Sequence, residues 1–167
     1  GYLRTNRITG FINKFIGNFG LKGFADGASD LSTGNSGNMI VEILGGGEHL
    51  LVAHMDTPRS TARLKPRFHR DRITSDGTTP LGVDDRGGLS SILFALERAV
   101  RDGNLKPCTL LFTVCEETTL AGSVYYKPAP AVKYGFVFDS YLSPGNFVSE
   151  TCGAINFELV VRGVSAH

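Results

Sequence analysis

The sequence places a histidine and an aspartate two positions apart at the end of an apolar run. In the segment LVAHMDTP, residues 50–53 have the composition of a buried strand and lead directly into His54, with Asp56 two positions later. In open α/β sheets, functional sites form at the carboxyl ends of the strands. A histidine ligand binds zinc through a neutral ring nitrogen, and a carboxylate at the other nitrogen fixes its tautomer. A histidine and an aspartate with this spacing occur more often in an ordinary turn at the end of a strand than in a metal site. A metal site therefore requires further acidic residues.

Two adjacent aspartates follow in the segment LGVDDRGG, where Asp84 and Asp85 precede a region rich in small residues that is typical of a helix start. Negative charges at the first turn of a helix are stabilised by its dipole. Simple helix capping therefore explains this pair when it is considered alone.

Two further acidic clusters follow apolar runs that are typical of buried strands. Residues 109–114 lead through Cys115 into Glu116 and Glu117, and residues 135–138 lead into Asp139. Adjacent carboxylates beside a core repel one another and are costly to desolvate, and a bound cation removes that cost. Capping does not explain these clusters, so they favour a metal centre.

The combination of ligand types indicates the kind of metal. One imidazole with several carboxylates suits zinc, manganese or cobalt, whereas an all-oxygen set suits magnesium or calcium. The number of acids predicts two divalent ions, most naturally zinc, held by a bridging carboxylate. Such a pair lowers the pKa of a shared water and polarises a scissile carbonyl, and a glutamate that is not a ligand takes the proton of the water.

The elements that position these residues alternate between helix and strand. Residues 8–19 have the periodicity of an amphipathic helix that Gly20 closes, and residues 89–100 have that of a second helix. Strands are predicted at residues 39–44, 50–55, 109–114 and 135–138, the last two buried on both faces, and a hairpin is predicted at residues 67–78. This order predicts an α/β fold with a mixed, mostly parallel sheet flanked by helices.

The last part of the sequence has a different pattern. Residues 154–161 alternate apolar and polar side chains, as a half-exposed strand would. We therefore expect residues 1–150 to form a metal-binding catalytic domain and residues 151–167 to begin a second domain.

The composition excludes several classes of function. The chain has 167 residues, 41% of them hydrophobic and 20% charged, and its net charge of +1 gives no footprint for nucleic acid or a membrane surface. Its three cysteines form no CxxC pair, which argues against a disulfide framework and favours a reducing compartment such as the cytoplasm. No apolar run is long enough to span a membrane.

In this order, the four clusters resemble the co-catalytic metallopeptidase family that includes peptidase T, aminoacylase and the glutamate carboxypeptidases. The resemblance is strongest to the peptidase T-like branch, through the segment KPRFHRDRITSDGTTPLGVDDRGG. It implies a zinc-peptidase-like catalytic domain and hydrolysis of short peptides, as by a tripeptide aminopeptidase. It also implies that residues 151–167 hold the first strand of a ferredoxin-like lid domain, through which the full-length chain forms a homodimer.

The resemblance also implies a role for each site residue. His54 and Asp139 would share one metal, Asp56 would support His54, and Glu117 would bind the second metal. Asp84 would bridge both metals, with Asp85 following it across a cis peptide, and Glu116 would be the general base. His167, in the ending GVSAH, would help to hold the substrate across a dimer interface.

One departure from the family pattern concerns the second metal. The family completes that site with a histidine near the end of a longer chain, and no such residue follows His167. His49 and His69 fall in a predicted turn and hairpin and do not replace it. We therefore expect the chain to be a fragment, whose activity in isolation is doubtful.

Three other functions remain open. An amidohydrolase that removes acyl groups from amino acids shares the same motifs. A binding module that keeps the fold without activity would have lost ligands, yet those that can be checked are present. A related group of aminopeptidases also has DDR-containing motifs, although the ending GVSAH favours the family with a lid.

Overall fold

The computed structural model describes residues 5–31, 35–153, 155 and 157–164. Their centre is a five-stranded sheet in the order β1-β2-β6-β3-β7, and a separate hairpin is formed by β4 and β5. The helices are α1 (Asn6–Gly17), α2 (Val83–Arg101), α3 (Glu116–Thr119) and α4 (Ala121–Tyr125), with the 3₁₀ helix η1 (Gly27–Leu31). The strands are β1 (Phe24–Ala25), β2 (Met39–Ile43), β3 (His49–His54), β4 (Pro66–Phe68), β5 (Ile73–Ser75), β6 (Cys108–Thr113) and β7 (Tyr134–Val137).

Strands β6, β3 and β7 run parallel, so their carboxyl ends meet at one edge of the sheet. The register pairs His54 with Thr113 of β6 and Val52 with Val137 of β7. The residues that directly follow these three strands are therefore neighbours in space, although they are far apart in the sequence. Strands β1 and β2 extend the sheet on the other side of β6 in antiparallel pairs. The expected mixed, mostly parallel sheet is confirmed.

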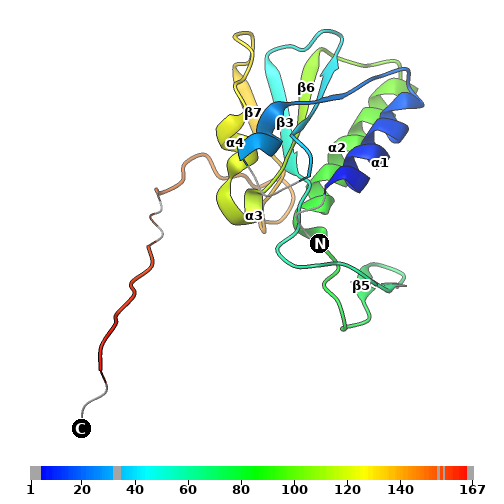
Figure 1. The fold of residues 1–167 in the computed structure, drawn as a ribbon. Helices are drawn as coiled ribbons and strands as arrows, with labels where there is room; N and C mark the ends of the chain where they lie inside the picture. The colour runs from blue at the N-terminus through cyan, green and yellow to red at the C-terminus, as the bar shows by residue number, and fades with distance from the viewer. Residues whose placement is uncertain (1–4, 32–34, 154, 156, 165–167) are drawn as a thin grey trace.

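The long helices α1 and α2 lie side by side on one face of the sheet (Figure 1). Each buries an apolar stripe in the main core, Ile12 and Ile16 from α1 and Leu89, Ile92, Leu93 and Leu96 from α2. The opposite face carries a smaller cluster, Ile40, Leu50 and Leu111. The core therefore fixes β3 and α2, which contribute His54 and the paired aspartates.

The end of the first helix follows the sequence prediction. Gly20 has a φ of +72°, a left-handed conformation that favours glycine. The Leu21 N–H donates to the Ile16 carbonyl at 3.2 Å, which is the pairing expected of a glycine-terminated helix. The predicted hairpin is also present, with Pro66 paired to Ser75 and Phe68 to Ile73.

Two strand predictions are wrong. β7 was expected to be buried on both faces, but all its residues are exposed, because it lies at the edge of the sheet and pairs only with β3. The strand expected at residues 154–161 is not formed at residues 155 and 157–161, which are exposed and lie outside both sheets. A strand requires a hydrogen-bonding partner, and no described segment pairs with these residues. The division into two domains stays a prediction.

No helix within the described ranges combines the length and the apolar character that crossing a membrane requires.

Candidate metal centre

His54 is the last residue of β3 and is almost fully buried. Its Nδ1 lies 3.1 Å from the backbone oxygen of Asp56 and 3.5 Å from the Asp56 Oδ1. Asp56 is itself fully buried, and its two carboxylate oxygens accept the backbone N–H groups of Glu116 and Glu117 at 3.1 and 3.2 Å. Asp56 therefore joins the end of β3 to the segment that follows β6, and it holds the imidazole so that Nε2 points away from the core.

The Nε2 atom of His54 faces carboxylates from three other segments. It lies 3.0 Å from Asp84 Oδ1, 3.7 Å from Glu116 Oε2, 3.9 Å from Glu117 Oε1 and 3.7 Å from Asp139 Oδ2. These residues enter α2, begin α3 and follow β7. The structure thus brings together all four clusters that the sequence selected.

The two adjacent aspartates point in different directions across a cis peptide bond, as the resemblance implied. Asp84 is largely exposed and meets Nε2 of His54. Asp85 is buried, and its Oδ2 accepts the backbone N–H of His54 while its Oδ1 accepts that of Gly88, both at 3.1 Å. A side chain at Gly88 would collide with the Phe138 backbone, so α2 approaches the end of β7 closely there.

The concentration of negative charge shifts the pKa values of the acids. Burial and the charge of Asp139 raise the pKa of Asp85 to about 6, although the His54 N–H opposes the shift. Burial and the charge of Asp84 raise the pKa of Glu117 to about 7. Burial also raises the pKa values of Glu116 and Asp139. The carboxylates therefore disfavour one another's charged forms.

The pKa values of His54 and Asp56 are shifted in the directions that favour a charged imidazolium beside a carboxylate. Burial alone would lower the pKa of His54, but the contact with Asp56 and the charges of Asp56, Glu116 and Asp139 raise it to about 9. Burial alone would raise the pKa of Asp56, whereas His54 and the N–H groups of Glu116 and Glu117 lower it. The protein thus stabilises Asp56 as a carboxylate.

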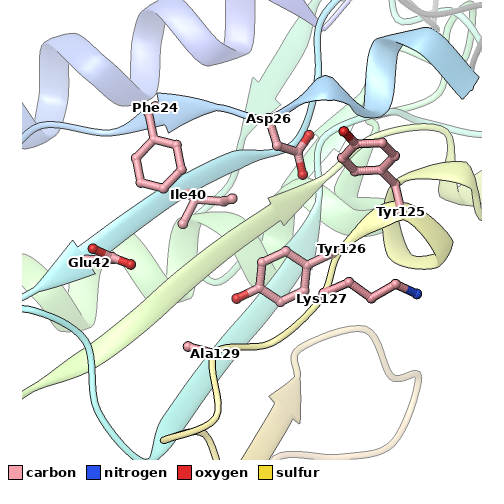
Figure 2. A pocket seen from close by; sticks show the side chains of 8 residues that line it. All are labelled: Phe24, Asp26, Ile40, Glu42, Tyr125, Tyr126, Lys127 and Ala129. Atoms are coloured by element: carbon pink, nitrogen blue, oxygen red, sulfur yellow. The ribbon is translucent and has the colours of Figure 1, made fainter.

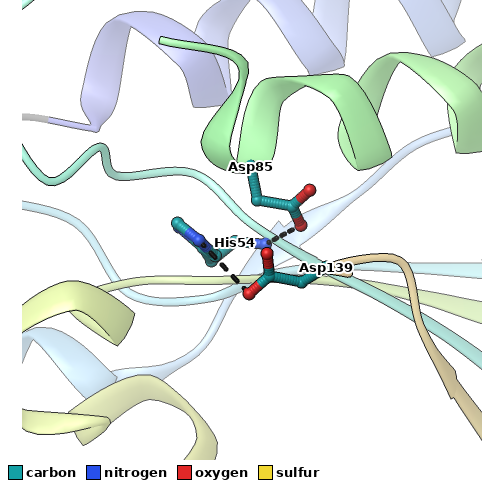
Figure 3. A group of neighbouring side chains, drawn as sticks. All are labelled: His54, Asp85 and Asp139. Carbon is teal, nitrogen blue, oxygen red and sulfur yellow. Dashed lines mark hydrogen bonds and ion pairs between the residues drawn. The ribbon is translucent and has the colours of Figure 1, made fainter. Parts of the chain in front are cut away.

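Two sets of side chains have the spacing of a metal site. His54, Glu116 and Glu117 can each offer an atom within 4.8 Å of the others, and so can His54, Asp85 and Asp139, which Figure 3 shows facing one another. Glu117 Oε1 is also buried, and it has no hydrogen-bond partner among the residues that the structure describes. An unpartnered carboxylate oxygen, directed at an imidazole nitrogen among other acids, fits a divalent cation.

Asp85 appears in one of these sets although the sequence did not select it as a ligand. Both of its oxygens already accept backbone N–H groups, which suits it to positioning His54 and the first turn of α2. Asp84 has an oxygen closer to Nε2 and remains the better candidate for a bridging ligand.

The sequence also missed Asn38, which is fully buried near the acidic segment. Its Nδ2 donates to the Gly122 carbonyl and to Asp26 Oδ2, both at 2.8 Å, and its Oδ1 accepts the Val114 N–H at 3.1 Å. Asn38 therefore fixes the backbone on both sides of the two glutamates. In the sequence, Asn38 is the last residue of a polar, loop-like stretch before the apolar residues 39–41, and nothing in that pattern indicates this role.

Neither His49 nor His69 joins the centre. His49 begins β3, at the opposite end of the strand from His54, and stacks on Tyr134. His69 lies in the hairpin, with its Nε2 3.1 Å from Thr74 Oγ1. His167 lies outside the described residues.

Two hollows lie on the described surface. One, of about 420 Å³, is lined by Thr57, Pro58, Arg59, Pro80, Leu81, Gly82, Val83 and Asp84, and so borders the centre. The other, of about 440 Å³, is shown in Figure 2 and includes Phe24, Glu42, Tyr125 and Tyr126. None of the clustered acids lines the second hollow, whereas Asp84 lines the first.

Comparison with known proteins gives consistent relatives. No protein-family model matches the chain. The chain is 28% identical over 148 residues to the uncharacterized protein YqjE of Bacillus subtilis, covering 85% of this chain and 40% of that protein. It is 30% identical over 133 residues to peptidase T of Streptococcus equi subsp. equi, covering 77% of this chain and 32% of the peptidase.

Solved structures agree with the sequence relatives. A tripeptidase from Staphylococcus aureus superposes with a TM-score of 0.70 at 26% identity, over 80% of this chain and 37% of that one. The aminopeptidase PepT from Bacillus cereus has a TM-score of 0.70 at 31% identity, over 81% of this chain and 38% of the aminopeptidase. The chain therefore spans no more than 40% of these relatives. In sequence and in fold, the chain is similar to one part of peptidase T-like proteins.

Proposed function

We propose that the full-length protein is a two-metal hydrolase that cleaves peptide bonds of short peptides. The observation that carries this proposal is the approach of four carboxylates to Nε2 of His54, one of them through a buried oxygen of Glu117 without a partner. The names of the relatives, peptidase T, tripeptidase and aminopeptidase, support peptides as the substrates.

The residues divide into ligands and supports. His54 and Asp139 would hold one ion, Glu117 the other, and Asp84 would bridge them. Zinc suits this mixed set of nitrogen and oxygen donors, although cobalt and manganese suit it as well. Bound ions would supply Lewis acidity at the scissile carbonyl and at the attacking water. Asp56 and Asp85 would keep His54 oriented, since both contact it and both oxygens of each carboxylate already accept a backbone N–H.

Glu116 would be the general base. Its carboxylate lies 3.7 Å from His54 Nε2, at the mouth of the cluster, and is more exposed than that of Glu117. It would take a proton from the attacking water and deliver it to the leaving amine. Its backbone N–H donates a hydrogen bond to Asp56, which fixes the position of the Glu116 backbone.

Other parts of the proposal concern the longer protein. We expect a further histidine beyond residue 167 to complete the second site. His167 would contact substrate, and a lid domain beginning near residue 151 would form a homodimer. A cytoplasmic location is proposed from the three free cysteines, one of which is exposed.

The first experiment is the metal content and activity of the full-length protein. Two ions per chain and hydrolysis of tripeptides are expected, and a parallel assay with N-acyl amino acids separates peptidase from deacylase. Glu116→Gln should nearly abolish turnover with two ions retained, whereas Glu117→Gln should lose an ion. No ion in the wild type would refute the metallopeptidase assignment.

A further inference from the structure

The segment between the two parts of the metal centre is strongly basic. Residues 59–78 contain six cations, Arg59, Arg63, Lys65, Arg67, Arg70 and Arg72, and two acids, Asp71 and Asp76, for a net charge of +4. The whole chain has a net charge of +1, so all the remaining residues together carry −3. We call residues 59–78 the basic segment; it makes the charge of this chain highly uneven.

The structure leaves this positive charge exposed. All six cations are exposed, and the hairpin of β4 and β5 extends past the edge of the sheet at which the parallel strands end (Figure 1). Arg72 pairs with the neighbouring Asp71 at 3.2 Å. Within the described ranges, no carboxylate lies within 4.0 Å of the other five cations. Most of the charge is therefore available to a ligand.

The start of the basic segment lies beside the metal centre. At its start, Arg59 lines the same hollow as Asp84, together with Pro80 and Leu81 from beyond its end. Thr61 accepts a hydrogen bond from Arg86 Nη1 at 3.1 Å, which ties the segment to the first turn of α2. A substrate that reaches Asp84 through this hollow must pass beside Arg59.

We propose that the basic segment selects peptides with acidic side chains, with Arg59 meeting a substrate carboxylate in the hollow and the hairpin attracting it from solution. This proposal rests on the peptidase function proposed above. An arginine can bind a carboxylate through two parallel hydrogen bonds, and like charges around a cleft raise the local concentration of an oppositely charged ligand. A peptide fits better than a long polyanion, because the rest of the chain is negative and would repel the polyanion beyond the hairpin.

The test is the ratio of kcat/KM for two matched peptides that differ by one Glu to Gln change, measured on the metal-loaded full-length protein. The ratio should favour the acidic peptide by about tenfold at low salt and should shrink near 0.15 M salt, where the Debye length is about 8 Å. Arg59→Gln should reduce the ratio, and so should the double variant Arg67→Gln with Arg70→Gln, which is remote from the hollow.

A matched control removes two cations from elsewhere. Lys14 on α1 and Lys106 before β6 are exposed and lie outside the basic segment, so the double variant Lys14→Gln with Lys106→Gln should keep the wild-type ratio. A fall in the ratio of the same size in this control would assign the effect to net charge and overturn the proposal.

Other outcomes separate this proposal from the proposed function. Equal turnover of the two peptides by the wild type would overturn the acidic preference and leave the peptidase intact. An oligonucleotide bound by the wild type and released by the hairpin variant, without any peptide preference, would make the ligand a polyanion instead. If the metal-loaded wild type hydrolysed none of the peptides, the peptidase function would be refuted. The proposed preference for acidic peptides would then be refuted as well.

Discussion

Asp85 accepts the backbone N–H of His54 through Oδ2 at 3.1 Å, so the residue after the candidate bridging ligand holds the backbone of the candidate histidine ligand. Its other oxygen accepts the Gly88 N–H in the first turn of α2. One buried carboxylate thus fixes β3 and α2 relative to each other at the point where the metal centre forms. Asp84, by contrast, directs its carboxylate at the His54 ring.

The two aspartates should therefore respond differently to replacement by asparagine. In Asp85→Asn, an amide NH₂ group must face one of the two N–H donors, so the metal-free protein should lose about 1–3 kcal/mol of stability. Metal affinity should fall by about 10- to 100-fold, as for other residues that orient a ligand. Urea unfolding of the metal-free protein and a zinc titration measure both effects.

Asp84→Asn serves as the matched comparison. It removes one negative charge from a repulsive cluster, so the metal-free protein should be at least as stable as the wild type, while metal binding is lost. Equal destabilisation by the two substitutions would show that Asp85 has no special part in holding the fold.

The stability of the metal-free protein should fall as the pH rises. Asp85 and Glu117 have pKa values of about 6 and about 7 in the folded protein, above their ordinary values of 3.8 and 4.5. At pH values between the ordinary and the raised pKa of each group, the folded state therefore binds more protons than the unfolded state. The stability that this difference provides is lost as the pH rises through 6 to 7. We expect these two carboxyls to lower the free energy of unfolding by about 4 kcal/mol between pH 5 and pH 8, and the raised pKa of His54 adds a loss of the same sign.

Urea unfolding at the two pH values, with a chelator present, measures this difference. Saturating zinc should remove or reverse it, because the ion favours the charged carboxylates. The combined variant Asp85→Asn with Glu117→Gln should lose the part of the dependence that these two carboxyls contribute and keep the part that comes from the raised pKa of His54. A metal-free wild type that is more stable at pH 8 would contradict the electrostatic repulsion described for the cluster.

The sequence was informative about the centre because its residues follow simple local patterns. His54, Glu117 and Asp139 each come after an apolar run, and parallel strands bring such positions to one edge of a sheet. The hydrogen bond from His54 to Asp85 joins residues 31 positions apart, and no local pattern specifies it. The exposure of β7 depends on what covers an edge strand, which its own apolar composition does not determine.

Asn38 shows the same limit, because its partners come from three separate segments. It satisfies the Val114 N–H, the Gly122 carbonyl and Asp26, and so fixes the backbone before and after Glu116 and Glu117. In the sequence it ends the polar, glycine-containing stretch 32–38 before an apolar strand, which is typical of a loop or turn. Its function is visible only once the chain is folded.

Replacement of Asn38 by leucine should therefore destabilise the protein and disturb the centre. The similar volume keeps the packing, but the Val114 N–H and the Gly122 carbonyl lose a buried partner, which costs about 1–3 kcal/mol for each group left unsatisfied. Asn13, which is exposed on α1, is the control, and Asn13→Leu should change stability by less than about 0.5 kcal/mol. Urea unfolding measures the loss of stability, and a zinc titration of the folded fraction measures the displacement of the glutamates. If the leucine variant were destabilised while binding zinc with wild-type affinity, Asn38 would support the fold alone, and the position of Glu117 would be set by Asp56.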